Sequence, residues 1–330
     1  MHAVVDFDFV KYTVASIGEN KTIKAIHPSG VEIDCKTRTE LWGHYLKKGG
    51  GILAEFNKAN NKHLRPEEFE IIDLVTYEPI ENILHTANQM VARSIRESGA
   101  TSFSGYVGKG ASFRLGRSTI LEYKGNRKDT EKPKFLDEVT DHIIRKYNPD
   151  VVEGLEADDW VVIDCNGRKD RVVVGVDKDY RGCNVLYYDV NRPNDGVINC
   201  MQLGELFLKS NGDVTGKGRK FFYHQILSGD GSDNYKANSA NPDIKWGEKS
   251  SYKLLKDCQT DKDCFEAMKK GYQLIYPEPK KIIGWRGDEL EIDWKYVFDE
   301  NFDMARMLRH PTDDVLVGTD ILDKFGLLEG

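Results

Sequence analysis

The chain of 330 residues lacks the features that mark several large classes of protein. No apolar run approaches the roughly 18 residues that cross a membrane, so we expect no membrane partner. The six cysteines form no C-x-x-C pair and show no zinc-like spacing with histidine, which favours buried free thiols in a reducing cytoplasm. No signal peptide is expected, because charged and polar residues interrupt the first apolar stretch too soon. Internal repeats and low-complexity tracts are also missing.

The overall charge leaves the class of partner open. The sequence holds 47 Lys and Arg against 54 Asp and Glu, a formal net charge of −7. Such a balance argues at first sight against a nucleic-acid partner. Many of the acids fall into four short clusters, however, and divalent ions bound there would cancel several charges. The local distribution of charge is therefore a better guide to the class of partner than the net charge is.

Four short acidic clusters are the most informative feature of the sequence. Their carboxylates are Asp6 and Asp8, then Glu156, Asp158 and Asp159, then Asp177 and Asp179, and finally Asp230 and Asp233. Carboxylates a few ångströms apart raise one another's pKa values strongly unless cations neutralise them. The oxygen-binding ions Mg²⁺ and Mn²⁺ suit such a group. Two such ions about 3.5–4 Å apart form a common apparatus for hydrolysing phosphodiesters, so the clusters predict a nuclease.

Each cluster also has a plainer structural interpretation. Acids at Glu156 and Asp158 favour the positive end of a helix and cap its free amides. The Asp177 cluster follows a strand as a turn does. Capping needs one acid, however, whereas adjacent acids add repulsion. Asp6 and Asp8 lie in a stretch predicted to be a strand, where alternation places both side chains on one face, and burying two carboxylates there is costly without partners.

The order of elements predicts an α/β protein. Strands expected at 3–10, 102–107 and 171–176 alternate with helices such as 81–98, which favours a Rossmann-like, mostly parallel sheet with helices on both faces. Ligands of such sheets lie at the carboxyl ends of the strands, where three of the clusters fall. Further segments are expected as a hairpin at 22–35 and helices at 39–48, 220–227, 249–256 and 304–309.

Two segments offer contacts for a phosphate backbone. Residues 108–133 are polar, punctuated by glycine, and rich in cations with aromatic rings among them. In the second segment, a glycine turn at Gly247 opens a helix with Lys249 and Ser250 in its first turn, and such amides and hydroxyls suit a phosphate. Two helices joined in this way, at about 220–258, hold a duplex backbone without reading bases.

In combination these motifs resemble the 5′-nuclease superfamily, which comprises flap endonucleases, the 5′-nuclease domain of bacterial DNA polymerase I and bacteriophage 5′–3′ exonucleases. The resemblance covers roughly residues 1–10 and 80–260, and its segment 108–127 is similar to the phage branch. It implies a PIN-like catalytic core at 1–190, with an insertion at about 11–79 and a helical arch at about 108–133. A mainly helical region at 191–330 would hold duplex DNA.

The resemblance also implies roles for individual residues. Two Mg²⁺ or Mn²⁺ ions would be held by the four acidic clusters, with Asp6, Glu156, Asp158 and Asp159 at the first ion and Asp177, Asp179, Asp230 and Asp233 at the second. Lys124 and Arg127 match basic arch residues that contact the scissile phosphate, and Tyr123 matches a ring that stacks on an unpaired base. The implied DNA-binding set is Lys109, Arg114, Tyr123, Lys128, Gly247, Lys249 and Ser250. A K⁺ ion is implied at the helix–turn–helix element.

Two features depart from the family's pattern. The family usually has an aspartate just after the second core strand, seven residues before the arginine that matches Arg114, and this chain has Val107 there. We expect Asp8 to replace it, since otherwise one metal site is weaker. The loop between the two helices, at 235–245, is longer than usual.

The predicted function is a divalent-metal-dependent 5′–3′ exonuclease or structure-specific flap endonuclease that leaves 5′-phosphates, in phage DNA replication or recombination. The expected partner is duplex DNA with a 5′ end or flap, bound by a monomer in the cytoplasm, which is the host's if the chain is phage-encoded. One alternative is an RNase H-like 5′-nuclease that removes RNA primers from an RNA/DNA hybrid, and the 2′-hydroxyl separates these substrates. The other is a DNA-binding protein of the same fold whose active site has weakened.

Overall fold

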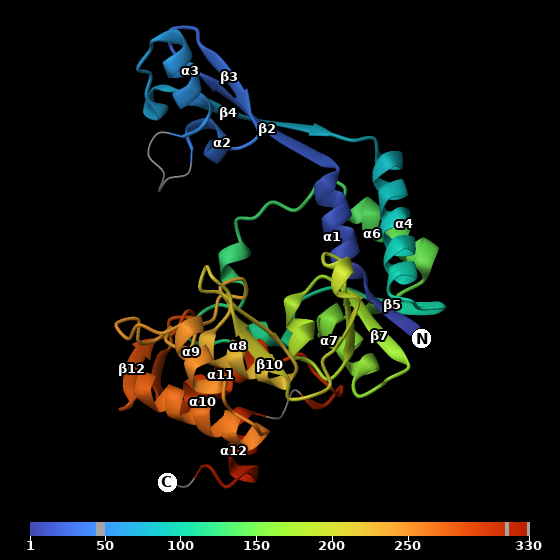
Figure 1. The fold of residues 1–330 in the computed structure, drawn as a ribbon, viewed down its shortest axis with the longest axis vertical. Coiled ribbons are helices and arrows are strands. Elements are labelled where there is room, and N and C mark those ends of the chain that lie inside the picture. Colours follow the sequence, from blue (N-terminus) through green and yellow to red (C-terminus); the bar gives the residue numbers. More distant parts are fainter. Residues whose placement is uncertain (44–49, 314–316, 329–330) are drawn as a thin grey trace. The chain divides into compact units, whose positions relative to one another are not determined.

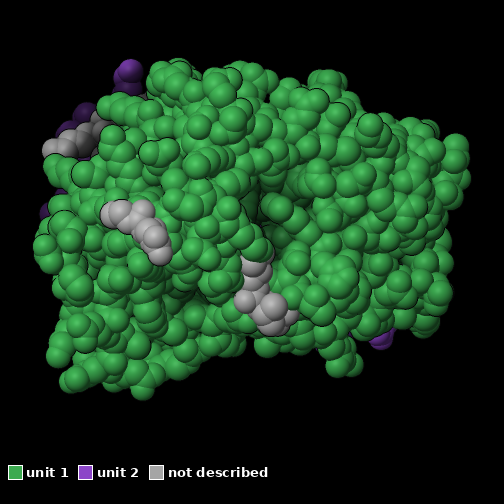
Figure 2. All heavy atoms as spheres, turned by 90° about the horizontal axis from the view of Figure 1, so that it is seen from below, with its two compact units in different colours: residues 1–10, 89–131, 143–330 green, residues 11–88, 132–142 purple. Residues whose placement is uncertain are grey.

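The computed structural model describes residues 1–43, 50–313 and 317–328. The chain forms two compact units, each built from separate stretches of sequence (Figure 2). Unit 1 comprises Met1–Val10, Gln89–Glu131 and Ile143–Gly330, and unit 2 comprises Lys11–Asn88 and Lys132–His142. The insertion expected at 11–79 falls within unit 2, whereas all four acidic clusters fall within unit 1.

Unit 1 is built on a six-stranded sheet, of which β5 and β7 are labelled in Figure 1, and its strand order is β6-β5-β1-β7-β8-β9. The strands are β1 (His2–Asp6), β5 (Ser102–Gly108), β6 (Asp150–Val152), β7 (Arg171–Gly175), β8 (Leu186–Asp189) and β9 (Val197–Asn199). Neighbours pair in parallel from β6 to β8, and β9 runs antiparallel to β8. The predicted class, a mostly parallel α/β sheet, is confirmed.

The sheet forms because its central strands are apolar on both faces, as parallel strands covered by helices require. In β7, Val172, Val173 and Val174 are all fully buried. Helix α7 (Ala157–Cys165) packs Val161 and Val162 into the same core cluster as the sheet residues. Burial of such a side chain contributes about 1.5–3 kcal/mol, so this apolar layer holds the sheet and α7 together.

The strand order sets the place of the functional site. The chain enters the sheet at β1, adds β5 and β6 on one side, and later adds β7 and β8 on the other. The direction of strand addition therefore reverses beside β1. In open parallel sheets, the crevice at the carboxyl ends of the strands next to such a reversal is where ligands bind.

One predicted strand is wrong in its extent. Residues 3–10 were expected to be extended, but β1 ends at Asp6 and helix α1 (Phe7–Ile17) begins at once. The carboxylate of Asp6 accepts a hydrogen bond from the backbone N–H of Asp8 at 2.9 Å, which is how a short acidic side chain starts a helix. Asp8 therefore lies in the first turn of a helix, and the alternation argument for its side chain is wrong.

The rest of unit 1 is mainly helical. Its further elements are α5 (Phe113–Arg117), η2 (Gly125–Arg127), η3 (Lys178–Gly182), η4 (Pro193–Asp195), α8 (Arg219–Ser228), α9 (Glu248–Leu255), α10 (Asp261–Ile275), α11 (Trp294–Ala305), α12 (Gly318–Lys324) and the hairpins β10 (Glu205–Leu208) with β11 (Val214–Lys217) and β12 (Lys280–Ile283) with β13 (Glu289–Ile292). Helix α8 is buried from Lys220 to Leu227 and shares an aromatic core with α10 and α11. The helices predicted at 220–227 and 249–256 are confirmed.

In the segment 108–133, predicted as a helical arch, the helices that the structure describes are the short α5 and η2. One helical prediction is wrong. A final helix was expected at 304–309, but α11 ends at Ala305 and Arg306 is extended, with φ −80° and ψ 137°. The extended backbone turns the carbonyl of Arg306 toward Arg114, from which it accepts a hydrogen bond.

Unit 2 contains an antiparallel sheet in the order β3-β2-β4. Its elements are β2 (Glu19–Ile26), β3 (Glu32–Cys35), α2 (Arg38–Trp42), α3 (Ile52–Asn60), η1 (Pro66–Glu68) and β4 (Glu70–Tyr77). Helices α1, α4 (Ile80–Glu97) and α6 (Leu136–Tyr147) each continue from one unit into the other. The hairpin predicted at 22–35 is confirmed. Of the helix predicted at 39–48 the structure shows α2, and residues 44–49 lie outside the described residues. None of the described helices is long and apolar enough to cross a membrane.

Candidate active site

The carboxyl edge of the sheet carries three of the acidic clusters. Asp6 is the last residue of β1, Glu156 is the N-cap of α7, and Asp177 is the N-cap of η3, two residues beyond β7. The first turn of α7 adds Asp158 and Asp159, and η3 adds Asp179. The fourth cluster follows α8, where Asp230 and Tyr235 pair through their backbones and Asp233 lies in the turn between them.

Carboxylates of different clusters lie close enough to act on one another: besides burial, Asp177 contributes to the raised pKa of Asp6, and Asp230 and Asp233 contribute to that of Asp179. Burial, and then the charge of Asp8, raise the pKa of Asp6 to about 7. Burial, and then the charge of Glu156, raise the pKa of Asp158 well above its usual range. Burial and Asp177 do the same for the pKa of Asp179. Such shifts are the mark of ionisable groups held together in a low-dielectric site.

Three cations lie among the acids. The Lys124 ammonium donates to Glu156 and lies 3.9 Å from Asp233. Arg127 donates to Asp233 Oδ1 over 3.1 Å. Although burial opposes it, the pKa of Glu156 falls to about 2 because of the charges of Arg114 and Lys124. Acids and bases are therefore interleaved at this edge, and the two predicted catalytic cations both lie within it.

Lys124 occupies a backbone conformation that ordinary residues seldom adopt. Its φ is +55°, in the left-handed region, and it precedes η2 as that helix's N-cap. Its backbone N–H donates to the carbonyl of Asp233 over 3.1 Å, which ties the basic segment to the fourth acidic cluster. Strain of this kind is found where surrounding contacts force a side chain into a required position.

Arg114 and Asp159 have structural roles that the sequence patterns did not predict. The Arg114 side chain is almost fully buried, and its two terminal nitrogens donate to the two oxygens of Asp159 over 2.7 and 2.9 Å. Asp159 Oδ1 also accepts from the N–H of Leu308 at 2.9 Å. The prediction that Arg114 contacts DNA is therefore wrong, because the folded chain already uses its donors. Asp159 is likewise a poor metal ligand, since both its oxygens are occupied.

Three other residues that were predicted to contact DNA lie in different surroundings in the structure. Tyr123 is 8% exposed and its hydroxyl donates to Glu156 at 2.9 Å, so stacking of its ring on a base is wrong. Lys128 is exposed and pairs with Glu122 over 2.6 Å. Lys109 is also exposed, with its ammonium 4.0 Å from Glu153. Neither lysine joins the acidic clusters, and both stay predictions as DNA contacts.

Asp8 lies where the replacement hypothesis requires it. Its Oδ1 accepts from the N–H of Gly108, the last residue of β5, over 2.9 Å. A Cβ added at Gly108 would lie 2.9 Å from Asp8 Oδ2 and 3.4 Å from the backbone nitrogen of Ala157. The carboxylate of Asp8 therefore reaches the end of the second core strand beside Val107, and lies next to the start of α7. Gly108 has to be small for that approach.

A small hollow among the acids fits divalent cations. It has a volume of about 70 Å³ and is lined by Asp158, Asp177, Asp179 and Asp233, with Lys124 and Arg127 at its side. Ligand oxygens of Glu156, Asp158 and Asp159 lie within 4.8 Å of one another, and of these Asp158 is the one not paired with a cation. Carboxylate oxygens are the donors that Mg²⁺ and Mn²⁺ prefer, and a bound ion would keep these acids ionised.

The sequence patterns missed several residues of this site. Lys178 pairs with Asp230 over 2.7 Å, Tyr180 donates to Asp6 Oδ2 over 3.1 Å, and the amide of Gln225 donates to Asp179. Lys178 and Tyr180 belong to the run Asp-Lys-Asp-Tyr, whose composition is itself a signal. Gln225 and the segment 306–308 carry no such signal, because only the packing of α8 and the end of α11 brings them to the acids.

The predicted phosphate-binding helix start forms a separate open groove. It is lined by 211–213 and 245–250, at the beginning of α9. Lys249 is exposed and its aliphatic chain passes over Gly212, where an added Cβ would lie 2.8 Å from Lys249 Cε. Ser250 lies in the first turn of α9 after the N-cap Gly247. The structure thus presents the three predicted residues together at one helix end.

Comparison with known proteins gives structural similarity alone. No protein-family model matches the chain, and no curated protein matches it. The T5 D15 protein crystallised with metal ions is similar, with 19% sequence identity and a TM-score of 0.44, over 76% of this chain and 93% of that one. A bacteriophage T5 D15 flap endonuclease in a pseudo-enzyme–product complex with DNA and metal ions is similar at 21% identity and a TM-score of 0.43, over 74% and 90%. Flap endonucleases are among the proteins that the sequence motifs resemble.

Replacing Arg114 will separate a structural from a DNA-binding role. Arg114→Ala leaves the buried Asp159 without its cation, so we expect the free energy of unfolding to fall by about 3–5 kcal/mol. Lys109→Ala, at another predicted DNA contact, will change it by less than about 0.5 kcal/mol. Urea unfolding of both variants measures the difference. Equal stabilities would contradict the structural role of Arg114.

Proposed function

We propose that the chain is a divalent-metal-dependent 5′-nuclease acting on DNA and leaving 5′-phosphates. The observation that carries this proposal is the assembly of buried carboxylates at the carboxyl edge of a parallel sheet, with Lys124 and Arg127 interleaved among them. Acids gathered for stability alone would be matched one to one by cations. Here burial and like charges raise the pKa values of Asp6, Asp158 and Asp179, so these acids stay ionised only if divalent ions neutralise them.

The residues that would hold two ions follow from where the carboxylates lie. Asp6, Asp8 and Asp158, at the ends of β1 and β5 and at the start of α7, would hold one ion. Asp177, Asp179 and Asp233, which line the hollow after β7 and α8, would hold the other. When bound, such ions supply Lewis-acid stabilisation of the reacting phosphodiester. Asp230 is held by Lys178, and its carboxylate also accepts from Ser232 at 2.6 Å, so its part is to shape the turn that carries Asp233.

Lys124 and Arg127 are placed to bind the reacting phosphate. In this structure both cations are paired with acids, Lys124 with Glu156 and Arg127 with Asp233. A phosphate arriving at the hollow offers them stronger, charge-assisted bonds. Their transfer to the phosphate would expose the oxygens of Glu156 and Asp233 to the ions. Positive charge held there in advance also stabilises the negative charge that develops during hydrolysis.

The groove at α9 is the proposed contact for the duplex. Gly247, Lys249 and Ser250 present a helix N-terminus, a cation and a hydroxyl, which are groups that suit a phosphate. Together with the acidic hollow, this groove favours a substrate with a duplex next to a 5′ end or flap. We further propose a role in phage DNA replication or recombination, and a K⁺ ion at the helix–turn–helix element stays a prediction.

A panel of 5′-labelled flap, blunt duplex and RNA/DNA hybrid with Mg²⁺, Mn²⁺ or chelator tests the proposed nuclease activity directly.

Removing the charge of one carboxylate of the hollow should abolish turnover. Asp158→Asn keeps the side-chain volume and removes a charge from the hollow, so we expect flap cleavage in Mg²⁺ to fall by at least about 10³-fold. Melting temperature in chelator should rise, because repulsion with Glu156 is relieved. Asp150→Asn, an exposed change on β6, is the matched control and should alter neither quantity. Normal cleavage by Asp158→Asn would refute the metal assignment.

Asp8 can be tested as the replacement for the aspartate that the family has where this chain has Val107. Asp8→Asn retains an oxygen that accepts from the N–H of Gly108 but loses the charge that an ion needs. We expect its cleavage rate to fall nearly as far as that of Asp6→Asn, while DNA binding in Ca²⁺ is retained. A normal rate for Asp8→Asn, with Asp6→Asn inactive, would show that Asp8 only holds the end of β5.

The two lysines should separate chemistry from binding. Lys124→Ala removes a cation beside the hollow, so single-turnover cleavage should fall by about 10² or more, with little change in duplex affinity. Lys249→Ala should weaken binding and reduce the salt slope of the affinity by about one, leaving the saturated rate nearly intact. Each variant is the control for the other. If Lys124→Ala weakens binding alone, its role at the reacting phosphate is wrong.

A further inference from the structure

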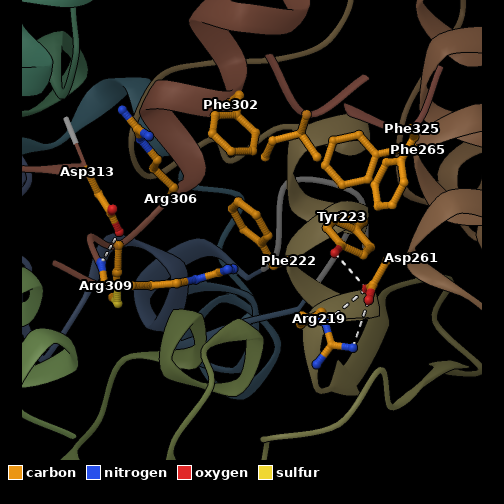
Figure 3. Close-up of a pocket in the computed structure, with 12 residues that line it drawn as sticks. Arg219, Phe222, Tyr223, Asp261, Phe265, Phe302, Arg306, Arg309, Asp313 and Phe325 are labelled. Carbon is orange, nitrogen blue, oxygen red and sulfur yellow. Dashed lines mark hydrogen bonds and ion pairs between the residues drawn. The ribbon is translucent and has the colours of Figure 1, made fainter. Parts of the chain in front are cut away.

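A second hollow in unit 1 is lined mainly by aromatic rings. It has a volume of about 230 Å³ and lies among α8, α10, α11 and α12 (Figure 3). The rings that line it are those of Phe222, Tyr223, Phe265, Phe302 and Phe325. The volume is below the about 300–1,000 Å³ of drug-sized pockets, so the hollow suits a ligand the size of a single planar ring system with a small substituent.

Three arginines and two aspartates line the hollow, and the arginines differ in how many of their donors already have partners. Arg219 is fully engaged, since its guanidinium donates to both oxygens of Asp261 at 2.9 Å. Arg306 is buried and pairs with Asp303 over 2.8 Å, and its Nε has no hydrogen-bond partner among the described residues. A buried donor left without a partner is costly, which makes Arg306 a donor that a ligand can satisfy.

Arg309 is the cation most available to a ligand. Its side chain is exposed, and in Figure 3 it reaches beneath the ring of Phe222. Its guanidinium carbon lies 5.9 Å from the centre of that ring. The neighbouring carboxylate of Asp313 accepts from the backbone N–H of Arg309 at 3.0 Å. An exposed guanidinium at the edge of an aromatic hollow combines the two groups that bind a planar anion.

We infer that this hollow binds a nucleotide, with the base against the aromatic rings and the phosphate at Arg309. Every base offers a flat face that stacks on aromatic side chains, and arginine matches phosphate by two parallel donors. The ligand is either a free nucleoside monophosphate or the terminal nucleotide of a strand, since both carry this chemistry. The inference does not depend on the proposed nuclease activity, because neither the rings nor Arg309 belong to the acidic hollow.

The hollow is joined to the acidic site by one segment of chain. Met307 lines both hollows. On either side of it, the carbonyl of Arg306 accepts from Arg114 and the N–H of Leu308 donates to Asp159. A nucleotide beside Arg306 therefore contacts the same segment that positions the acids at the start of α7.

Equilibrium binding to the full chain in chelator tests the inference, with dAMP, deoxyadenosine, inorganic phosphate and a short 5′-phosphorylated oligonucleotide as probes. We expect dAMP or the oligonucleotide to bind at least about tenfold more tightly than deoxyadenosine or phosphate, because only they engage both the rings and the cation. Tighter binding of dAMP would identify a free nucleotide as the ligand, and tighter binding of the oligonucleotide would identify a strand end.

Variants locate the binding. Arg309→Ala, an exposed change, should weaken binding at least about tenfold, and Phe325→Ala should weaken it similarly by removing a ring. Lys209→Ala, which removes an exposed charge outside the hollow, is the matched control and should have no effect. Lys124→Ala should also leave binding unchanged, which separates this hollow from the acidic site. Binding that is undetectable at millimolar dAMP and oligonucleotide, or that is unaltered by Arg309→Ala, would overturn the inference.

Discussion

The buried guanidinium of Arg114 is the interaction on which the arrangement of the site depends. It joins three segments that are far apart in sequence: its own helix α5, the start of α7 through Asp159 and Glu156, and the end of α11 through the carbonyl of Arg306. A charge removed from water this completely is tolerable only when its donors are used, and here they are. Because Asp159 and Glu156 are held, Asp158 between them on α7 is fixed toward the hollow.

Around that anchor, the site balances repulsion among acids against a smaller number of cations. Lys124, Arg127 and Lys178 each neutralise one or two carboxylates, and the raised pKa values of Asp6, Asp158 and Asp179 show where neutralisation falls short. A chain that kept its acids for stability alone would gain by losing some of them. Divalent ions and a phosphate would complete this balance. The ions would bring positive charge to the carboxylates, and the phosphate would bring negative charge to Lys124 and Arg127.

The segment after α11 gives the molecule a feature beyond the acidic site. Residues 306–308 contact three different parts of the molecule. The carbonyl of Arg306 accepts from Arg114, the side chain of Met307 lines both hollows, and the N–H of Leu308 donates to Asp159. Arg306 is extended and residues 306–308 lie outside any helix, so successive residues face different neighbours. The aromatic hollow and the acidic hollow therefore share a wall, and groups bound in one contact residues that support the other.

The sequence by itself determined the class of the fold and which residues are acidic, basic or apolar at each place. The apolar runs of β1 and β7, the helical spacing of 81–98 and the positions of the clusters after strands are local patterns, so the mostly parallel sheet and the gathering of the acids at its edge were predictable. Lys124 and Arg127 were predicted beside the acids, and the structure places them there.

Only the tertiary structure decided what each charged group is used for. The sequence does not distinguish Arg114 from Lys109, or Asp159 from Asp158, because burial and hydrogen-bond partners come from segments that meet only in the folded chain. Asp8 shows the same limit on a smaller scale: its alternation with Asp6 favoured a strand, but capping by Asp6 starts a helix instead, and the side chain reaches Gly108 by that route. Patterns of spacing record local geometry, whereas the role of a charge depends on the neighbours that folding gives it.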